Sequence, residues 1–255
     1  HSYSHIVVLT MAMGWLTLTH TGNNIPLCIV VMLVSAIVFT IATEPLFRPL
    51  SVRGADLETV TLAMGIGIII TEFISKYINS GANFAFPDAM TGRQNTINIG
   101  LISFSAANIV TLVCCAVVAV ALMWFLFKSK EGRAIRAMAQ NLRVARMLGI
   151  PFGRTGVLGF GIAGLLAGII AILCIMTLGA GSPALGDTFA VKAIILMLFA
   201  GMGNLKGGLL SALFMGVVEA MALAYLPGRW TEAVFYGVIM LVIIWKPNGL
   251  FGKQH

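Results

Sequence analysis

Eight apolar stretches follow one another along the chain, separated by shorter polar connections. Most contain at least about 17 residues with few charges, enough to cross a bilayer whose hydrocarbon core is about 30 Å thick. Within each stretch the apolar residues are continuous and do not alternate with polar ones, which predicts helices and not the strands of a barrel. The expected helices are residues 6–19, 26–43, 60–77, 103–127, 155–178, 189–202, 207–226 and 231–245.

This pattern predicts an all-α fold, a polytopic transmembrane bundle of about eight helical segments within one domain, residues 1–255. Segments 6–19 and 189–202 are short for a full crossing and are candidates for broken or re-entrant helices. Gly164 and Gly168 form a small-xxx-small step, which favours close packing of helix backbones. The longest basic connection is residues 128–154.

Composition supports a membrane protein. Hydrophobic residues make up 59% of the chain and charged residues only 10%, and the mean hydropathy is +0.98. In a typical soluble domain, charged residues make up roughly a quarter of the chain. We therefore expect an integral membrane protein with many crossings.

The basic residues divide unevenly between the two sides of the predicted bundle. If the connections alternate across the membrane, twelve Lys and Arg residues fall on one side, two (Arg93 and Arg229) on the other, and Lys76 and Lys192 lie within helices. Because positive connections remain in the cytoplasm, connection 128–154 and the C-terminus are expected to be cytoplasmic. Topology then accounts for the net charge of +7, so no nucleic-acid partner is expected. The twelve are Arg48, Arg53, Lys128, Lys130, Arg133, Arg136, Arg143, Arg146, Arg154, Lys206, Lys246 and Lys253.

No catalytic or metal-binding constellation is expected. The four cysteines lie inside apolar stretches without metal-ligand spacing, and the four histidines lie near the chain ends. The three aspartates lie in connections, and neither a His-Glu-x-x-His helix nor a Walker phosphate-binding motif is found. We therefore predict that the chain is no enzyme and holds no metal or cofactor of its own.

The basic connection contains an expected amphipathic helix, residues 133–149. One arc of this helix is apolar and another gathers arginines, with Gly149 and Pro151 ending it. The helix either lies on anionic lipid headgroups or inserts its apolar face into a groove on a soluble partner. The apolar arc is Ala134, Ile135, Met138, Leu142 and Ala145.

Two charged residues fall inside expected helices of the C-terminal part. Lys192 lies in 189–202 and Glu219 in 207–226. Charges within membrane segments are costly and often functional. They are expected either to pair as a structural clamp or to line a solute path.

The order of residues in the basic connection carries a resemblance. "GRAIRAMAQNLRVARMLGI", residues 132–150, resembles the cytoplasmic loop of the permeases of branched-chain amino acid (Liv-type) ABC importers. "FAVKAIILMLFAGMGNLKGGLLSALFMGVVEA", "WKPNGLFGK" and "EPLFRPLS" are similar to three other parts of that family, although Pro45 replaces its usual Arg. The matching loop positions are Gly132, Arg133, Arg136, Ala137, Asn141, Ala145, Leu148, Gly149 and Ile150.

The resemblance implies half of a translocation pathway in the bacterial inner membrane. Its partners would be a second permease subunit, similar or identical, two cytoplasmic ATPase subunits that hold ATP and Mg²⁺, and an extracytoplasmic solute-binding protein. Helix 133–149 would couple the permease to the ATPase. The residues expected to act in coupling are Gly132, Arg133, Ile135, Arg136, Met138, Asn141, Leu142, Ala145 and Gly149.

The chain departs from the family near its start. The family opens with a further helix and an Asn-Phe-Ala-His-Gly segment, so we expect this chain to begin inside or just after that segment. His1 or His5 would then be the family histidine; the spacing favours His5, although Ile6 stands at the glycine position. His5 is thus a third candidate for the solute path.

The solute remains open at this point. Branched-chain amino acids are the first expectation, and urea, short amides and aromatic acids are alternatives within the same architecture. An ion-coupled secondary transporter that works without an ATPase is the alternative from another class.

Overall fold

The computed structural model describes residues 2–91, 96–99, 102–201, 205–246 and 249–250. The chain forms two compact units, His1–Ala190 and Val191–His255. Parts of the sequence patterns noted above, including residues 202–204, Arg93 and Lys253, lie outside the described residues. The long helices are α1 (Ser2–Thr21), α2 (Ile25–Arg53), α3 (Asp56–Tyr77), α5 (Ala106–Lys128), α8 (Phe152–Leu178), α9 (Leu185–Ala200), α10 (Leu205–Tyr225) and α11 (Gly228–Trp245).

These eight helices correspond one by one to the eight predicted segments. Five helices in the described part of the chain are long and apolar enough to cross a membrane: α2, α3, α5, α8 and α10. The all-α polytopic bundle is therefore confirmed, and the chain is a multi-pass membrane protein.

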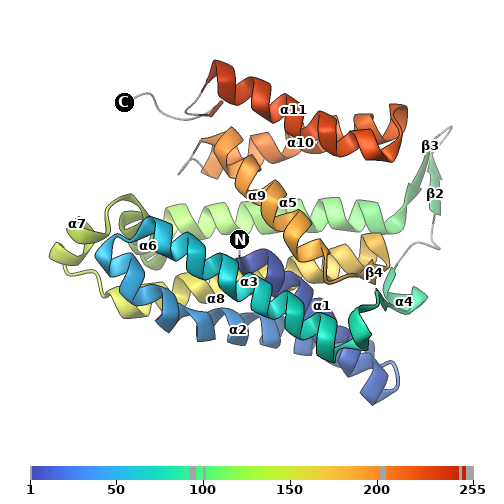
Figure 1. The fold of residues 1–255 in the computed structure, drawn as a ribbon, viewed down its shortest axis with the longest axis horizontal. Helices are drawn as coiled ribbons and strands as arrows, with labels where there is room; N and C mark the ends of the chain where they lie inside the picture. The colour runs from blue at the N-terminus through green and yellow to red at the C-terminus, as the bar shows by residue number, and fades with distance from the viewer. Residues whose placement is uncertain (1, 92–95, 100–101, 202–204, 247–248, 251–255) are drawn as a thin grey trace. The chain divides into compact units, whose positions relative to one another are not determined.

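The first unit is organised by the close packing of α2 on α8, the most extensive helix pair in the chain (Figure 1). A Cβ atom at Gly164 would lie 2.8 Å from the carbonyl oxygen of Ala36, and one at Gly168 would lie 3.1 Å from the Leu33 side chain. Only glycine lets the two backbones approach this closely without displacement of the neighbours. The predicted packing role of this glycine step is confirmed.

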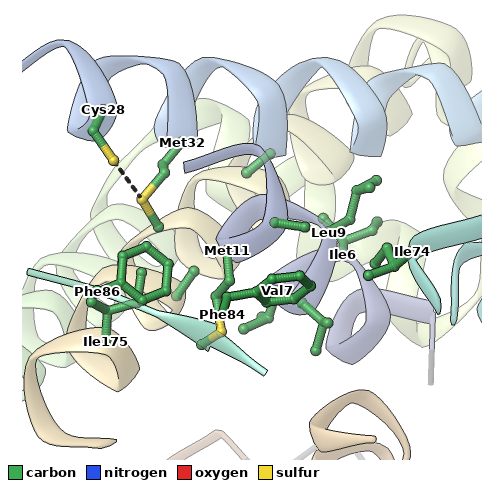
Figure 2. Packing of buried hydrophobic residues seen from close by; sticks show 14 of the residues in the cluster. Ile6, Val7, Leu9, Met11, Cys28, Met32, Ile74, Phe84, Phe86 and Ile175 are labelled. Atoms are coloured by element: carbon green, nitrogen blue, oxygen red, sulfur yellow. Dashed lines mark hydrogen bonds between the residues drawn. The ribbon is translucent and has the colours of Figure 1, made fainter. Parts of the chain in front are cut away.

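The core of this unit lies among α1, α2, α3 and α8 (Figure 2). Met11, Met32 and Ile74 are fully buried there together with Phe84. Phe84 belongs to the short strand β1 (Phe84–Ala85), which pairs antiparallel with β4 (Ala180–Gly181). Strand pairing thus brings the connection that follows α3 onto the end of α8 and places an aromatic ring in the core.

The helix predicted over 26–43 was too short, because α2 continues to Arg53 through Pro45 and Pro49. Each proline removes one backbone hydrogen bond. The two prolines are four residues apart, so they fall on the same side of the helix, and membrane helices tolerate such positions. The helix ends where Gly54 adopts a left-handed conformation, with φ of 70°.

The connection 79–100, expected as a loop, contains short ordered elements. A 3₁₀ turn (Asn79–Gly81) and the short helix α4 (Asp88–Thr91) follow α3. The strands β2 (Thr96–Ile99) and β3 (Ile102–Ser105) then form an antiparallel hairpin that leads into α5. The helix predicted over 103–127 therefore begins later than expected, at Ala106, because residues 103–105 belong to β3. Sequence periodicity did not reveal these elements, because each spans only two to four residues.

The second unit contains α10, α11 and the part of α9 from Val191. Phe199, Met215, Phe235 and Ile239 form its buried core. The Leu250 backbone N–H donates to the Phe199 carbonyl at 2.8 Å. A Cβ atom at Gly249 would lie 2.5 Å from the Gly201 nitrogen, so a glycine is needed where the chain returns to the end of α9.

Candidate functional site

The polar connection between α5 and α8 folds into two helices, where one was predicted over 133–149. α6 spans Lys130–Gln140 and α7 spans Leu142–Met147. Asn141 separates them: it has an extended backbone, and its side-chain oxygen accepts a hydrogen bond from the Val144 backbone N–H at 3.1 Å. An asparagine that caps a new helix interrupts the preceding one, which is why the single-helix prediction was wrong at this position.

α6 is held tightly against the end of α5. The Ser129 hydroxyl oxygen accepts from the Gly132 N–H at 2.8 Å, and a Cβ atom at Gly132 would lie 2.4 Å from the Phe125 carbonyl oxygen. Arg136 Nε donates to the Leu126 carbonyl oxygen at 3.0 Å. Three of the predicted coupling residues, Gly132, Arg133 and Arg136, are thus used to fix this corner, since Arg133 Nη1 also donates to the Lys128 carbonyl oxygen.

The apolar side of α6 faces the chain itself. Ile135 and Met138, with Leu142, line a cavity of about 260 Å³ together with residues of α2 and α8. All three side chains are half-buried. Three of the five residues of the apolar arc therefore line a concavity that the chain itself forms.

An ion pair between a buried carboxylate and an exposed arginine lies at the same cavity and was missed by the sequence reasoning. Glu44 is only 3% exposed, and Arg48 donates to both of its carboxylate oxygens, from Nε at 2.9 Å and from Nη2 at 2.8 Å. A Cβ atom at Gly156 of α8 would lie 3.0 Å from Glu44 Oε1, so glycine provides the room for the carboxylate. The available signal was an acid and a base four residues apart, which the prolines of this segment obscured.

α7 and the residue that follows it carry three exposed apolar side chains. Met147 is 82% exposed and Leu148 is 75% exposed, and Val144 beside them is also exposed. Of the predicted coupling residues here, Ala145 is buried and Gly149, with φ of 80°, follows the last helical turn as predicted. Among the described residues of this connection, the exposed apolar surface is thus concentrated on and just after α7.

The two charged residues predicted within the C-terminal helices meet. Lys192 Nζ donates to Glu219 Oε1, which links α9 to α10 within the second unit. The Lys192 nitrogen also lies 5.4 Å from the centre of the Phe235 ring on α11, a cation–π geometry. Both charged side chains are about three-quarters buried. The pair therefore joins all three helices of this unit.

His5 lies in a separate polar cluster of the first unit. Its ring is 1% exposed, with Nδ1 3.1 Å from Thr71 Oγ1 and Nε2 3.6 Å from Asp187 Oδ1. Cβ atoms at Gly67 and Gly186 would lie 2.4 Å and 2.6 Å from the imidazole. Two glycines thus admit the ring between α3 and the start of α9. No group of three or more metal-ligating side chains is found among the described residues.

Comparison with known proteins places these features in a family context. Residues 2–244 match the family described as "Branched-chain amino acid transport system / permease component". The chain is 27% identical over 241 residues to the high-affinity branched-chain amino acid transport system permease protein BraD of Pseudomonas aeruginosa, a match that covers 91% of the chain and 77% of BraD.

Two further relatives show the breadth of the similarity. LivH of Salmonella typhimurium, named as a high-affinity branched-chain amino acid transport system permease protein, is 28% identical over 212 residues, 81% of the chain and 67% of LivH. The xylose transport system permease protein XylH of Escherichia coli is 31% identical over 133 residues, 49% of the chain and 34% of XylH. No solved structure matches the chain.

Proposed function

The chain belongs to the branched-chain amino acid transport permease family, and on this premise we propose that it forms half of a solute pathway that ATPase subunits drive through α7. A second permease subunit, similar or identical, completes the pathway, and two cytoplasmic ATPase subunits and an external solute-binding protein complete the transporter. Branched-chain amino acids are the proposed solute. BraD and LivH, which match most of the chain, are both named as branched-chain amino acid transport permeases.

The proposed orientation follows the distribution of positive charge. If the connections alternate across the membrane as the sequence predicts, the side that carries α6 and α7 holds twelve of the basic residues, and positive connections remain in the cytoplasm. The ATPase subunits and the C-terminus are then on this side, and the hairpin β2–β3 is on the outside.

The observation that carries the coupling proposal is the outward apolar side of α7. Exposed apolar side chains on a polar connection are expected to be covered by a partner, and Met147 and Leu148 are the most exposed of them. α6 acts differently in this proposal. Its Ile135 and Met138 line a cavity together with residues of α2 and α8, and in this proposal a movement of α7 passes through α6 to the helices of the bundle.

The experiment is ATP-dependent uptake of leucine into proteoliposomes that contain the permease, its ATPase subunits and its binding protein. Met147→Asp is expected to reduce uptake at least about tenfold, because a carboxylate at the centre of an apolar contact loses its hydration. Leu57→Asp is the matched control: Leu57 is 81% exposed against 82% for Met147, and an acidic residue in the first turn of α3 is favourable. Unchanged uptake with Met147→Asp, or uptake by the permease without ATPase subunits, would contradict the proposal.

The buried polar groups have a proposed role within the bundle. We propose that Lys192 and Glu219 form a structural clamp among α9, α10 and α11. The alternative, for this pair and for His5, is that these side chains line the solute path. Glu219→Gln separates the two, since loss of subunit assembly supports the clamp, and loss of uptake by an assembled transporter supports the path.

A further inference from the structure

A second cavity lies where the C-terminal end of α2 meets α7. Its volume is about 550 Å³, within the range of roughly 300–1,000 Å³ that is typical of small-molecule sites. The polar side chains that line it are Ser51, Arg53, Asn141, Arg143 and Arg146. Three guanidinium groups therefore border one concavity, and no Asp or Glu is among the described residues that line it.

The arginines of this region differ in whether another group of the chain forms an ion pair or hydrogen bond with the guanidinium group. Outside the cavity, Arg48 binds Glu44, Arg154 lies 3.9 Å from Glu131, and Arg136 donates to a carbonyl oxygen. Arg133 also donates to a carbonyl oxygen.

Arg53, Arg143 and Arg146 have no such partner within the part of the chain that the structure describes. Among the arginines of this region, the ones that lack such a partner are thus the ones that share the cavity. Like charges gathered in a concavity repel one another and raise the local concentration of anions.

We propose that this cavity binds a phosphate group, supplied by the headgroup of an anionic phospholipid. Guanidinium groups bind phosphate through two parallel hydrogen bonds, and three positive charges favour an anionic headgroup over a zwitterionic one. The Ser51 hydroxyl and the Asn141 side-chain amide add neutral donors at the wall. Because α2 is one of the membrane-crossing helices, its end lies at the depth of the headgroups.

The test uses the full-length permease, purified without partner subunits in a neutral detergent. Phosphatidylglycerol or phosphatidylcholine is titrated in, and bound lipid is measured by native mass spectrometry together with the unfolding temperature. The wild-type protein is expected to bind phosphatidylglycerol saturably and to unfold at a higher temperature, and phosphatidylcholine is expected to have no such effect.

The variants assign this effect to the cavity. Arg143→Gln with Arg146→Gln is expected to weaken binding at least about tenfold, since two charge-assisted pairs are lost. Lys128→Gln with Lys130→Gln changes the net charge equally outside the cavity and is expected to bind as the wild type does. Arg143→Lys keeps the charge but not the paired geometry and is expected to show an intermediate loss. Equal binding by the two double variants would overturn the proposal.

Two further arms identify the source of the anion. Inorganic phosphate and glycerol 3-phosphate are added in place of lipid. If they bind with the same dependence on Arg143 and Arg146, the site takes soluble phosphate compounds and the lipid assignment is overturned; if they do not, the lipid is supported. If no phosphate compound binds, but added ATPase subunit protects Arg143 from an arginine-modifying reagent, the cavity receives an acidic protein segment and the phosphate proposal is overturned.

Discussion

α6 and α7 lie next to each other in the same polar connection, yet their large apolar side chains differ in exposure. Ile135 and Met138 of α6 line a cavity with α2 and α8, whereas Val144 and Met147 of α7 are exposed. Asn141 is the residue that makes this difference possible, because it ends one helix and caps the next. An amphipathic pattern predicts that an apolar face will be covered, but it does not say whether the chain or a partner covers it.

The largest difference in stability is expected between substitutions at two glycines, one within α6 and one just after α7. Gly132→Leu should destabilise the fold by about 3 kcal/mol or more, because its side chain would overlap the backbone of Phe125 and Leu126 at the α5–α6 corner. Gly149→Ala should cost about 1 kcal/mol, since nothing lies within 4 Å of its Cβ position and only the positive φ is unfavourable.

The unfolding temperatures of the purified variants in detergent check this order. A Gly132→Leu protein as stable as Gly149→Ala would show that α6 is not held against α5 as described.

A charge placed on each apolar face provides the second contrast. Ile135→Asp should destabilise the permease by about 2 kcal/mol, because the carboxylate enters a largely apolar cavity beside the occupied Glu44–Arg48 pair. Val144→Asp should change stability by less than about 0.5 kcal/mol, as surface substitutions do. Thermal unfolding of the isolated permease measures both. Equal stability of the two variants would mean that the two faces are equally exposed.

The boundary between the helices should give the smallest effect. Asn141→Ala removes the side-chain oxygen that caps α7 and should cost about 1 kcal/mol, whereas Asn141→Asp, which retains an acceptor, should cost a few tenths. Amide hydrogen exchange within residues 142–147 reports the opening of α7 directly. Faster exchange throughout α6 in the alanine variant would argue that the two helices are not independent.

The long helices could be predicted because a membrane crossing requires a continuous apolar run. Each of the eight predicted segments contains a helix in the structure, and the contact between Lys192 and Glu219 is formed. The glycine step was also readable, since Gly164 and Gly168 share one side of α8. These features depend on length, spacing and composition along one segment.

The missed features depend on contacts between segments. Prolines predict a helix end from local propensity, but α2 continues past Pro45 and Pro49 while it packs on α8. Glu44 was therefore assigned to a connection, and its burial against Gly156 was not foreseen. At Asn141 the tendency of asparagine to cap a new helix opposes the helix propensity of the residues on both sides. The sequence alone did not decide between one helix and two.

Cross-linking of the permease to its ATPase subunit tests the central claim most directly. Met147→Cys and Met138→Cys are compared in the assembled transporter with a thiol-reactive photo-cross-linker. Both replace a methionine, one 82% exposed on α7 and one half-buried beside the cavity that α6 shares with α2 and α8. The account predicts an adduct to the ATPase subunit from position 147, and none above background from position 138. Equal or stronger cross-linking from position 138 would mean that the apolar face of α6 contacts the ATPase, and would contradict the account.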